Sequence, residues 1–375
     1  MIKHIKSMTE VNANCWNRLI QSKDPFVRHE FLWALEQSES VCEQTGWLPH
    51  HLLVFQKEEL IAVMPLYLKT HSRGEYIFDQ QWADAYSQSG MEYYPKWVNA
   101  IPFTPCQGQR LLIKQGIDEQ KIIQSCINYI TQLSEKNNIS SLHILFPNEQ
   151  QTGLLKQQLM LREGVQFHWF NKGYVDFNDY LQSFTSRQRK KINKERRNVK
   201  DLGIQFQRLE GRNISEQQWQ VFFMFYEMTY QKRGQKAYLS INFFKQLAQT
   251  MPEQIIIVFA IKENLYVGAA LSFVGEDTLY GRYWGCYQEF NNLHFETCYY
   301  QGLEYCFEKK LKRFDSGAQG EHKIARGFEP ITTYSAHWIL NPHFSTLIDN
   351  FLEREKILIN QYKQDCFQQL PFKKI

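Results

Sequence analysis

The chain has 375 residues, of which 43% are hydrophobic and 22% charged, and its formal charge is +4. These values are close to those of globular proteins and exclude a disordered or collagen-like chain. No apolar run approaches the roughly 20 residues of a membrane span, and the N-terminus lacks the apolar core of a secretion signal. The eight cysteines have no zinc-finger spacing. We therefore expect a cytoplasmic protein without a metal site.

The hydrophobic pattern predicts helices and strands in an α+β order. In the first half we expect a helix at 26–40, a hairpin at 51–69, a loop-rich aromatic stretch at 76–97, a strand near 110–114, a helix at 118–136, a strand at 142–146, a helix at 149–161 and a strand at 165–176. In the second half we expect helices at 215–233 and 240–250, strands at 254–261, 265–274 and 277–286, a helix at 293–310, a strand at 312–317, a turn or short helix at 320–329, a strand at 332–340 and a helix at 344–364. This order favours a mostly antiparallel sheet.

The two halves contain similar strand-turn-strand segments. Val54-Phe55 aligns with Val258-Phe259, and Leu60 aligns with Leu265 after a shift of one residue. We therefore predict two α/β units of similar topology, each with a mixed, largely antiparallel sheet flanked by helices. Their predicted bounds are 1–165 and 166–375, and the second unit begins with the strand that leads into a basic helix.

That basic helix is the most uneven feature of the charge distribution. Residues 187–200 contain eight Lys or Arg and one Glu, a net charge of +7, which leaves the rest of the chain at −3. One interpretation is a solvated helix face packed through a narrow apolar stripe. The other is an anchor for a polyanion such as tRNA, a nucleotide phosphate or an acidic lipid surface. The candidate contacts are Arg187, Arg189, Lys190, Arg196 and Arg197.

The element order with its doubled hairpin resembles the GNAT acyltransferase fold. The duplicated form with a basic helix resembles the Fem-type transferases, which add amino acids from aminoacyl-tRNA to peptidoglycan precursors. Several stretches resemble the Fem-like family of predicted N-acyltransferases, also described as peptidoglycan biosynthesis/recognition proteins, and the resemblance covers about 20–340. They are HSRGEYIFDQQWADAY (71–86), YYPKWVNAIPFTPCQG (93–108), DTLYGRYWGCY (277–287), LHFETCYYQGLEYCFEKKLKRFDSGAQGEHKIARGFEP (293–330) and TYSAHWI (333–339).

This resemblance implies an N-acyltransferase that moves an acyl or aminoacyl group to an amine, on a peptide or a cell-wall precursor, with acyl-CoA or aminoacyl-tRNA as donor. The alternative is a non-catalytic protein of the same fold that recognises peptidoglycan-type peptides or RNA. A third possibility is a subunit whose basic helix docks on nucleic acid or acidic lipid. The loop from Cys286 to Glu296 has no glycine, whereas GNAT domains that use acetyl-CoA usually hold its pyrophosphate on a glycine-rich loop. This departure weakens acetyl transfer from acetyl-CoA.

The richest polar cluster is the run from Gly317 to Phe328, which includes Gln319 and follows a predicted strand. Lys323 and Arg326 are three residues apart and suit a phosphate or carboxylate. Glu321 or His322 is our candidate for the base that deprotonates the amine. The alternative is a capped turn with a surface ion cluster. The resemblance to Fem enzymes implies that Lys323 contacts substrate.

Two further clusters are candidate binding sites. Glu75, Asp79 and Asp84 lie among aromatic residues and could bind a cationic amine, with Asp84 as a second candidate base and Tyr86 and Tyr94 as contacts. The alternative is a loop whose carboxylates cap local backbone. Strand alternation places Arg282 and Trp284 on one face, either in a groove wall or in an outer-face stack. We predict that segment 319–326 and the Asp84 segment face one cavity.

Overall fold

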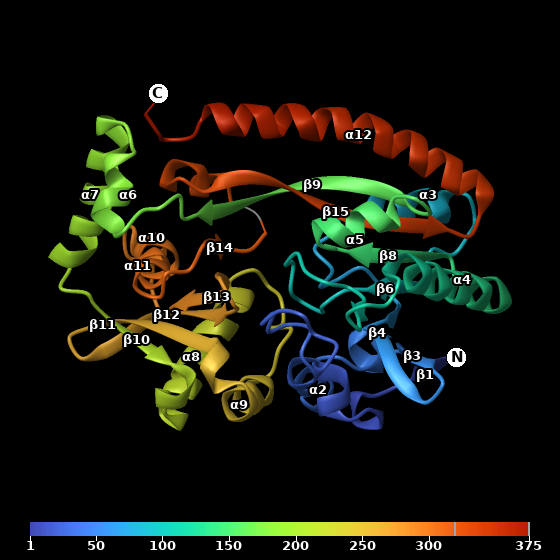
Figure 1. The fold of residues 1–375 in the computed structure, drawn as a ribbon. Helices are drawn as coiled ribbons and strands as arrows, with labels where there is room; N and C mark the ends of the chain where they lie inside the picture. Colours follow the sequence, from blue (N-terminus) through green and yellow to red (C-terminus); the bar gives the residue numbers. More distant parts are fainter. Residues whose placement is uncertain (319, 374–375) are drawn as a thin grey trace. The chain divides into compact units, whose positions relative to one another are not determined.

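The chain divides into two compact units. The computed structural model describes residues 1–318 and 320–373 (Figure 1). Unit 1 consists of Met1–Val165 and Thr332–Tyr362, and unit 2 of Gln166–Ile331 and Lys363–Ile375. The predicted domains were continuous segments, whereas residues Thr332–Tyr362 pack with unit 1 although they follow unit 2 in the sequence. The reason is that strand β15 pairs with a strand of unit 1 and that helix α12 begins against a helix of unit 1.

Unit 1 contains two groups of strands. The first has the order β1-β3-β4-β7, and the second has the order β15-β8-β6-β5-β2, in which only β6 and β8 are parallel. The strands are β1 (Ile2–Ile5), β2 (Trp47–Pro49), β3 (His51–Gln56), β4 (Glu59–Met64), β5 (Tyr67–Lys69), β6 (Lys96–Asn99), β7 (Leu112–Ile113), β8 (Ser141–Leu145) and β15 (Glu329–Ile339). The helices are α1 (Ala13–Asn17), α2 (His29–Gln37), α3 (Gln80–Gln88), α4 (Glu119–Asn137), α5 (Glu149–Leu155) and α12 (Pro342–Gln368).

Helix α4 covers the core of unit 1. Asp118 caps its first turn by accepting a hydrogen bond from the Lys121 amide at 3.1 Å, and Asn138 ends it in the left-handed conformation. Its buried apolar residues recur every three or four positions, as expected for an amphipathic helix. They are Ile122, Ile123, Cys126, Ile127 and Ile130, and they pack on residues of β3, β4, β6 and β8.

Helix α3 lies within the stretch that we predicted to be loop-rich. That prediction is wrong for Gln80–Gln88, because Trp82 and Tyr86 are one helical turn apart and share a buried face. This face packs on Phe344 and Ile348 at the start of α12. A hydrophobic partner about 260 residues further along the chain therefore decides the local structure.

Unit 2 is built on a sheet with the order β10-β11-β12-β13-β14-β9, in which only β13 and β14 are parallel. The strands are β9 (Met160–Phe170), which belongs to this unit from Gln166 onward, β10 (Gln205–Glu210), β11 (Ile255–Lys262), β12 (Leu265–Val274), β13 (Thr278–Cys286) and β14 (Arg313–Asp315). The helices are α6 (Phe177–Gln182), α7 (Ser186–Asp201), α8 (Glu216–Gln231), α9 (Ile241–Thr250), α10 (Leu293–Phe295) and α11 (Gln301–Glu308), with a π-helical turn, η5 (Glu296–Tyr300), between α10 and α11 and a short 3₁₀ helix, η6 (Glu321–Arg326), after β14.

The two units share a motif. Each has an antiparallel hairpin whose register shifts near the turn, after Val54 in β3 and after Ala260 in β11. Each also has a parallel strand pair, β6 with β8 and β13 with β14, whose strands are connected through a helix. The predicted hairpins are present, and the predicted α+β class is confirmed. Within residues 1–318 and 320–373, we find no helix that combines the length and the apolar character needed to cross a membrane.

Candidate functional site

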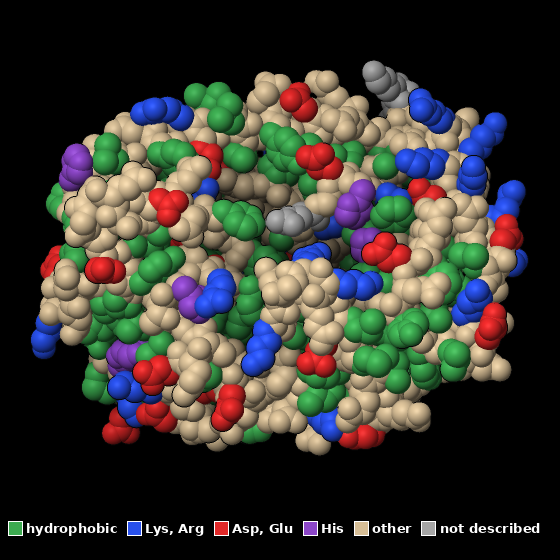
Figure 2. Space-filling view, turned by 180° about the vertical axis from the view of Figure 1, so that it is seen from behind, with side chains coloured by type: hydrophobic (Ala, Val, Ile, Leu, Met, Phe, Trp, Pro, Cys, Tyr) green, Lys and Arg blue, Asp and Glu red, His purple; other side chains and the backbone are tan. Residues whose placement is uncertain are grey.

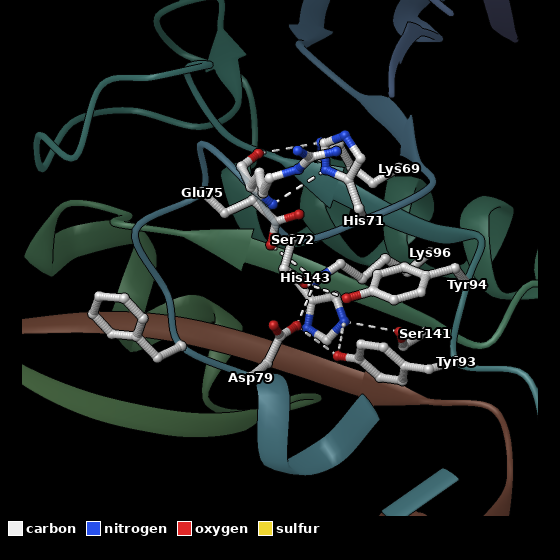
Figure 3. Close-up of polar contacts among 12 residues, drawn as sticks. Lys69, His71, Ser72, Glu75, Asp79, Tyr93, Tyr94, Lys96, Ser141 and His143 are labelled. Atoms are coloured by element: carbon white, nitrogen blue, oxygen red, sulfur yellow. Dashed lines mark hydrogen bonds and ion pairs between the residues drawn. The ribbon is translucent and has the colours of Figure 1, made fainter. Parts of the chain in front are cut away.

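A buried ion cluster lies in unit 1 around Lys96, the first residue of β6. Figure 3 shows three oxygen acceptors converging on its ammonium group. The Lys96 Nζ atom lies 2.8 Å from Ser72 Oγ, 2.8 Å from Glu75 Oε2 and 2.5 Å from Asp79 Oδ2. All three N–H groups of Lys96 are therefore used. Lys96 is fully buried, and Glu75 and Asp79 are 3% and 2% exposed.

The cluster changes the pKa of each member. Burial raises the pKa of Glu75 to about 7, and the Lys96 charge only partly opposes this. Burial also disfavours the charged form of Asp79, but the adjacent Lys96 and several hydrogen bonds lower its pKa overall. Burial and the Lys96 charge lower the pKa of Lys69 to about 7, although Glu75 opposes the change. Groups with such shifted pKa values are often found at functional sites, so this cluster is a candidate site.

A chain of hydrogen bonds continues from Asp79 into the core of unit 1. Tyr93 donates its hydroxyl proton to Asp79 Oδ2 at 2.7 Å, and its oxygen lies 3.2 Å from His143 Nε2. His143 Nδ1 lies 2.6 Å from His337 Nδ1, and His337 Nε2 lies 2.7 Å from Ser335 Oγ. Burial lowers the pKa of both histidines, so that both are neutral at pH 7. Through Tyr93, this chain of hydrogen bonds orients the Asp79 carboxylate.

The other predicted residues of this segment lie around the cluster. Asp84 is exposed on α3 and accepts a hydrogen bond from Gln80 Nε2 at 2.7 Å. Tyr86 is buried, with its ring 4.0 Å from that of Phe344, which is a core contact. Tyr94 is half-buried, and its hydroxyl lies 2.8 Å from Ser72 Oγ. The structure thus brings together Glu75, Asp79 and Tyr94, and it separates Asp84 from them.

Unit 2 also has a buried lysine, Lys323 of η6. It is 2% exposed, and its Nζ donates to the backbone oxygens of Ser316 and Gly317 at 3.1 and 2.8 Å. Burial lowers its pKa to about 7, Asp315 opposes this change, and Arg282 reinforces it. A neutral lysine amine has two N–H donors and one lone pair. Two carbonyl acceptors therefore satisfy its donors and leave the lone pair available for a proton.

Arg282 and Asp315 lie beside Lys323 where β13 and β14 stop pairing. The parallel pairs end at Tyr280 and Asp315, and the register shift opposite Leu271 and Ser272 leaves Arg282 as an extra residue in β13. Such a bulge redirects a side chain. The Arg282 Nη2 atom lies 3.1 Å from Asp315 Oδ2, and His168 Nε2 lies 3.6 Å from Asp315 Oδ1. Burial disfavours ionisation of Asp315, but Arg282 lowers its pKa overall.

The remaining predicted residues of the 317–328 run differ in exposure. Glu321 and His322 are exposed, and His322 Nε2 lies 2.9 Å from the Tyr299 hydroxyl. Partial burial, Lys323 and Arg326 lower the pKa of His322 to about 4. Arg326 is buried and donates to Glu195 Oε2 at 2.7 Å, so its guanidinium holds η6 on α7. Gln319 lies outside the described residues.

Trp284, the partner that we predicted for Arg282, is half-buried in β13, with its ring 5.6 Å from that of His294. Because Asp84 and η6 belong to different units, the cavity that we expected them to share stays a prediction.

The basic run forms α7, whose apolar stripe is buried through Ile192 and Val199. Arg187, Lys190 and Arg197 are exposed, and Arg189 is half-buried with a hydrogen bond to Gln182. Figure 2 shows blue basic side chains along the edge of unit 2 where α7 lies. Arg196 differs from this group, because it lies 3.0 Å from Glu296 and 2.7 Å from Glu304 within unit 2. We therefore assign Arg196 to holding α7 in place.

Sequence reasoning missed Lys96, Lys69, His143 and Asp315 as site residues. Two of them, Lys96 and His143, carried a signal that could have been used, since each is a titratable residue within an apolar strand, in YPKWV and LHILF. Such residues are rarely buried without a partner. In the described part of the chain, no group of three or more His, Cys, Asp or Glu is arranged to hold a metal ion.

The protein is thus an α+β protein of two units, each with a buried lysine. Comparison with known proteins identifies its family. The family model named FemAB-like, described as peptidoglycan biosynthesis/recognition, matches residues 7–374. The chain therefore belongs to this family. No curated protein sequence matches the chain.

Solved structures support the same fold. FemX has a TM-score of 0.54 at 13% identity, over 93% of this chain and 100% of its own. The C-terminal domain of a putative lysylphosphatidylglycerol synthetase from Agrobacterium fabrum has a TM-score of 0.56 at 9% identity, over 92% and 97%. The structure titled L-PGS from Bacillus licheniformis has a TM-score of 0.51 at 9% identity, over 88% and 98%. The duplicated GNAT-like fold that the Fem resemblance implied is confirmed.

Proposed function

We propose that the protein is an N-acyltransferase that moves an acyl or aminoacyl group to an amine of a peptide or cell-wall precursor. Membership of the FemAB-like family supports peptidoglycan chemistry. The observation that carries the proposal is Lys323, a buried lysine held by two backbone carbonyls, with a pKa lowered to about 7. A general base is most effective when its pKa is near the working pH.

In the proposed reaction, the acceptor amine attacks the donor carbonyl. A new C–N bond forms, the ester C–O or thioester C–S bond breaks, and the leaving oxygen or sulfur takes up a proton. The neutral Lys323 amine accepts the proton that the attacking nitrogen loses. His322 is the second candidate for proton transfer, because it is exposed and neutral at pH 7. Arg282 is fixed by Asp315 beside Lys323 and supplies positive charge for the developing oxyanion.

We infer that the donor is aminoacyl-tRNA rather than acyl-CoA. The loop between β13 and α10 contains no glycine, and the three-residue helix α10 is too short to offer the usual phosphate cradle. The exposed cations of α7 favour a donor with many phosphates, because each phosphate neutralised by a cation releases counterions.

A donor screen tests the proposed function. The protein is incubated with a cell-wall precursor peptide and with either aminoacyl-tRNA or acetyl-CoA, and the acceptor is analysed by mass spectrometry. We expect the acceptor to gain the mass of one aminoacyl residue with the tRNA donor. Binding of the peptide without transfer from any donor would contradict catalysis and favour the non-catalytic alternative.

Reversing the charge of α7 should weaken tRNA binding. We expect the Arg187→Glu, Lys190→Glu, Arg197→Glu triple variant to lose most of its affinity for total tRNA at low salt. The slope of log Kd against log salt should become less steep by about 0.9 for each phosphate that the variant no longer neutralises. Fluorescence anisotropy over a salt series measures both quantities.

A matched variant of equal charge change serves as the control. Lys121, Lys136 and Lys156 are exposed in unit 1, and their reversal to Glu should leave the salt slope unchanged. Equal tRNA binding by both triple variants would show that net charge, and not the α7 face, controls the interaction.

A further inference from the structure

The ion cluster of unit 1 has acceptor atoms that the described residues do not use. All three donors of Lys96 point to Ser72, Glu75 and Asp79. Within the described residues, the second oxygen of each carboxylate, Glu75 Oε1 and Asp79 Oδ1, is buried and accepts no hydrogen bond. A buried acceptor without a donor costs free energy, and the cost is greater when the acceptor is charged. Both acceptors belong to residues that also bind one ammonium group.

The charge balance shows what kind of group would satisfy these atoms. When ionised, Lys96, Glu75 and Asp79 together carry one more negative than positive charge. Lys69 also influences the charge of Glu75, but its Nζ lies over the Trp47 ring, 3.9 Å from the centroid, and donates to the Arg73 backbone oxygen at 3.5 Å. The two free oxygens of the cluster therefore lack N–H donors. A positively charged group is the donor that suits them best.

The surroundings of the cluster already accommodate one cation, the Lys96 ammonium group. The rings of Tyr93 and Tyr94 lie 5.3 and 5.7 Å from the Lys96 ammonium, within the range of cation–π attraction. Glu75 and Asp79 both lie in the segment between β5 and α3, which has no strand or helix. Phe78 in this segment is 71% exposed. Both carboxylates therefore lie on one irregular segment, which reaches the protein surface at Phe78.

We propose that Glu75 Oε1 and Asp79 Oδ1 form a binding site for the ammonium or guanidinium group of a ligand. The site lies within unit 1 and is distinct from Lys323, and it does not depend on acyl transfer. A ligand ammonium group supplies three N–H donors and a guanidinium group supplies five, which is enough for the two carboxylate oxygens. The ligand class is a peptide or amino-acid derivative with a basic side chain.

Isothermal titration calorimetry tests this site with three probes. They are Nα-acetyl-L-lysine amide, Nα-acetyl-L-arginine amide and Nα-acetyl-L-norleucine amide, which has no cation. We expect the lysine or the arginine probe to bind and the norleucine probe to show no heat. Glu75→Gln should weaken binding by about 10- to 100-fold, the loss expected for a hydrogen bond to a charged group.

Two matched variants test whether the probes bind at these carboxylates. Exposed Glu92 lies outside the cluster, and Glu92→Gln should bind the probes as the wild type does. Lys69→Met removes the competing cation and should bind the probes at least as tightly as the wild type. A Tm measured for each variant confirms that it is folded.

Three results would overturn the proposal. They are equal binding of the norleucine probe, undiminished binding by folded Glu75→Gln, and no binding of any probe by the wild type. The last result would assign the two oxygens to internal water. None of them involves turnover, so the test of acyl transfer at Lys323 stands or fails separately.

Discussion

Replacing Lys323 with methionine should lower kcat/KM for acyl transfer by about 10²–10⁴-fold, the usual contribution of a general base. The same change should leave Tm unchanged or raise it. The reason is that Lys323 is buried with its pKa lowered from 10.5 to about 7. The folded state therefore disfavours its charged form, and methionine removes this cost while it retains a similar length.

The same pKa shift determines how the stability of the protein changes with pH. Because the pKa of Lys323 is lower in the folded than in the unfolded state, the cost is largest below pH 7 and falls as the pH rises toward 10.5. The stability gain of Lys323→Met over the wild type should therefore be greater at pH 6.5 than at pH 9.5. The wild-type rate should rise with pH through about 7 as the amine becomes neutral.

Lys312→Met is the control, because Lys312 is exposed just before β14, and it should leave both rate and Tm unchanged. A fall in Tm of more than about 5 °C for Lys323→Met would make Lys323 structural. Full activity of a folded Lys323→Met protein would remove it from the mechanism.

Replacing Lys96 with methionine should have the opposite effect on stability. We expect a loss of about 3–5 kcal/mol in the free energy of unfolding, because two buried carboxylates lose their shared counter-ion. Burial alone would lower the pKa of Lys96, but Glu75 and Asp79 raise it, which indicates that the folded state favours the charged lysine. Urea denaturation monitored by circular dichroism measures the loss.

Neutralising the carboxylates tests whether their unpaired charge causes the stability loss of Lys96→Met. The triple variant Lys96→Met, Glu75→Gln, Asp79→Asn should recover much of the stability lost by Lys96→Met alone, since no unpaired charge remains. If the triple variant is no more stable than the single variant, the cost comes from packing around Lys96 and not from charge.

The fold was largely predictable because its signals are local. The hairpins at 51–69 and 254–274 follow from β-branched residues around short polar turns, and β3–β4 and β11–β12 form there. Helix α3 was not predictable from its own residues, because its buried face depends on α12. We also did not predict that residues 332–362 belong to unit 1. The pairing of β15 with β8 that places them there cannot be inferred from the sequence of either strand alone.

The candidate site was predictable only in part. Glu75 and Asp79 stood out as carboxylates among aromatic residues, and Lys323 stood in a polar run after a strand. Their partners did not, because Lys96 is 21 residues from Glu75 and its role depends on tertiary contact. Arg196 illustrates the reverse error: it looked like one cation of a basic face, yet two carboxylates 100 and 108 residues away hold it.

The discontinuous make-up of unit 1 has a consequence for its biosynthesis. His337 of β15 contacts His143 of β8 across 194 residues of sequence. At a synthesis rate of about 5–20 residues per second, roughly 10–40 seconds pass between the synthesis of β8 and that of its partner β15. An unpaired strand edge is a site of aggregation. Most of unit 2 is therefore translated while unit 1 is still incomplete, and this interval is when the nascent chain most needs a chaperone.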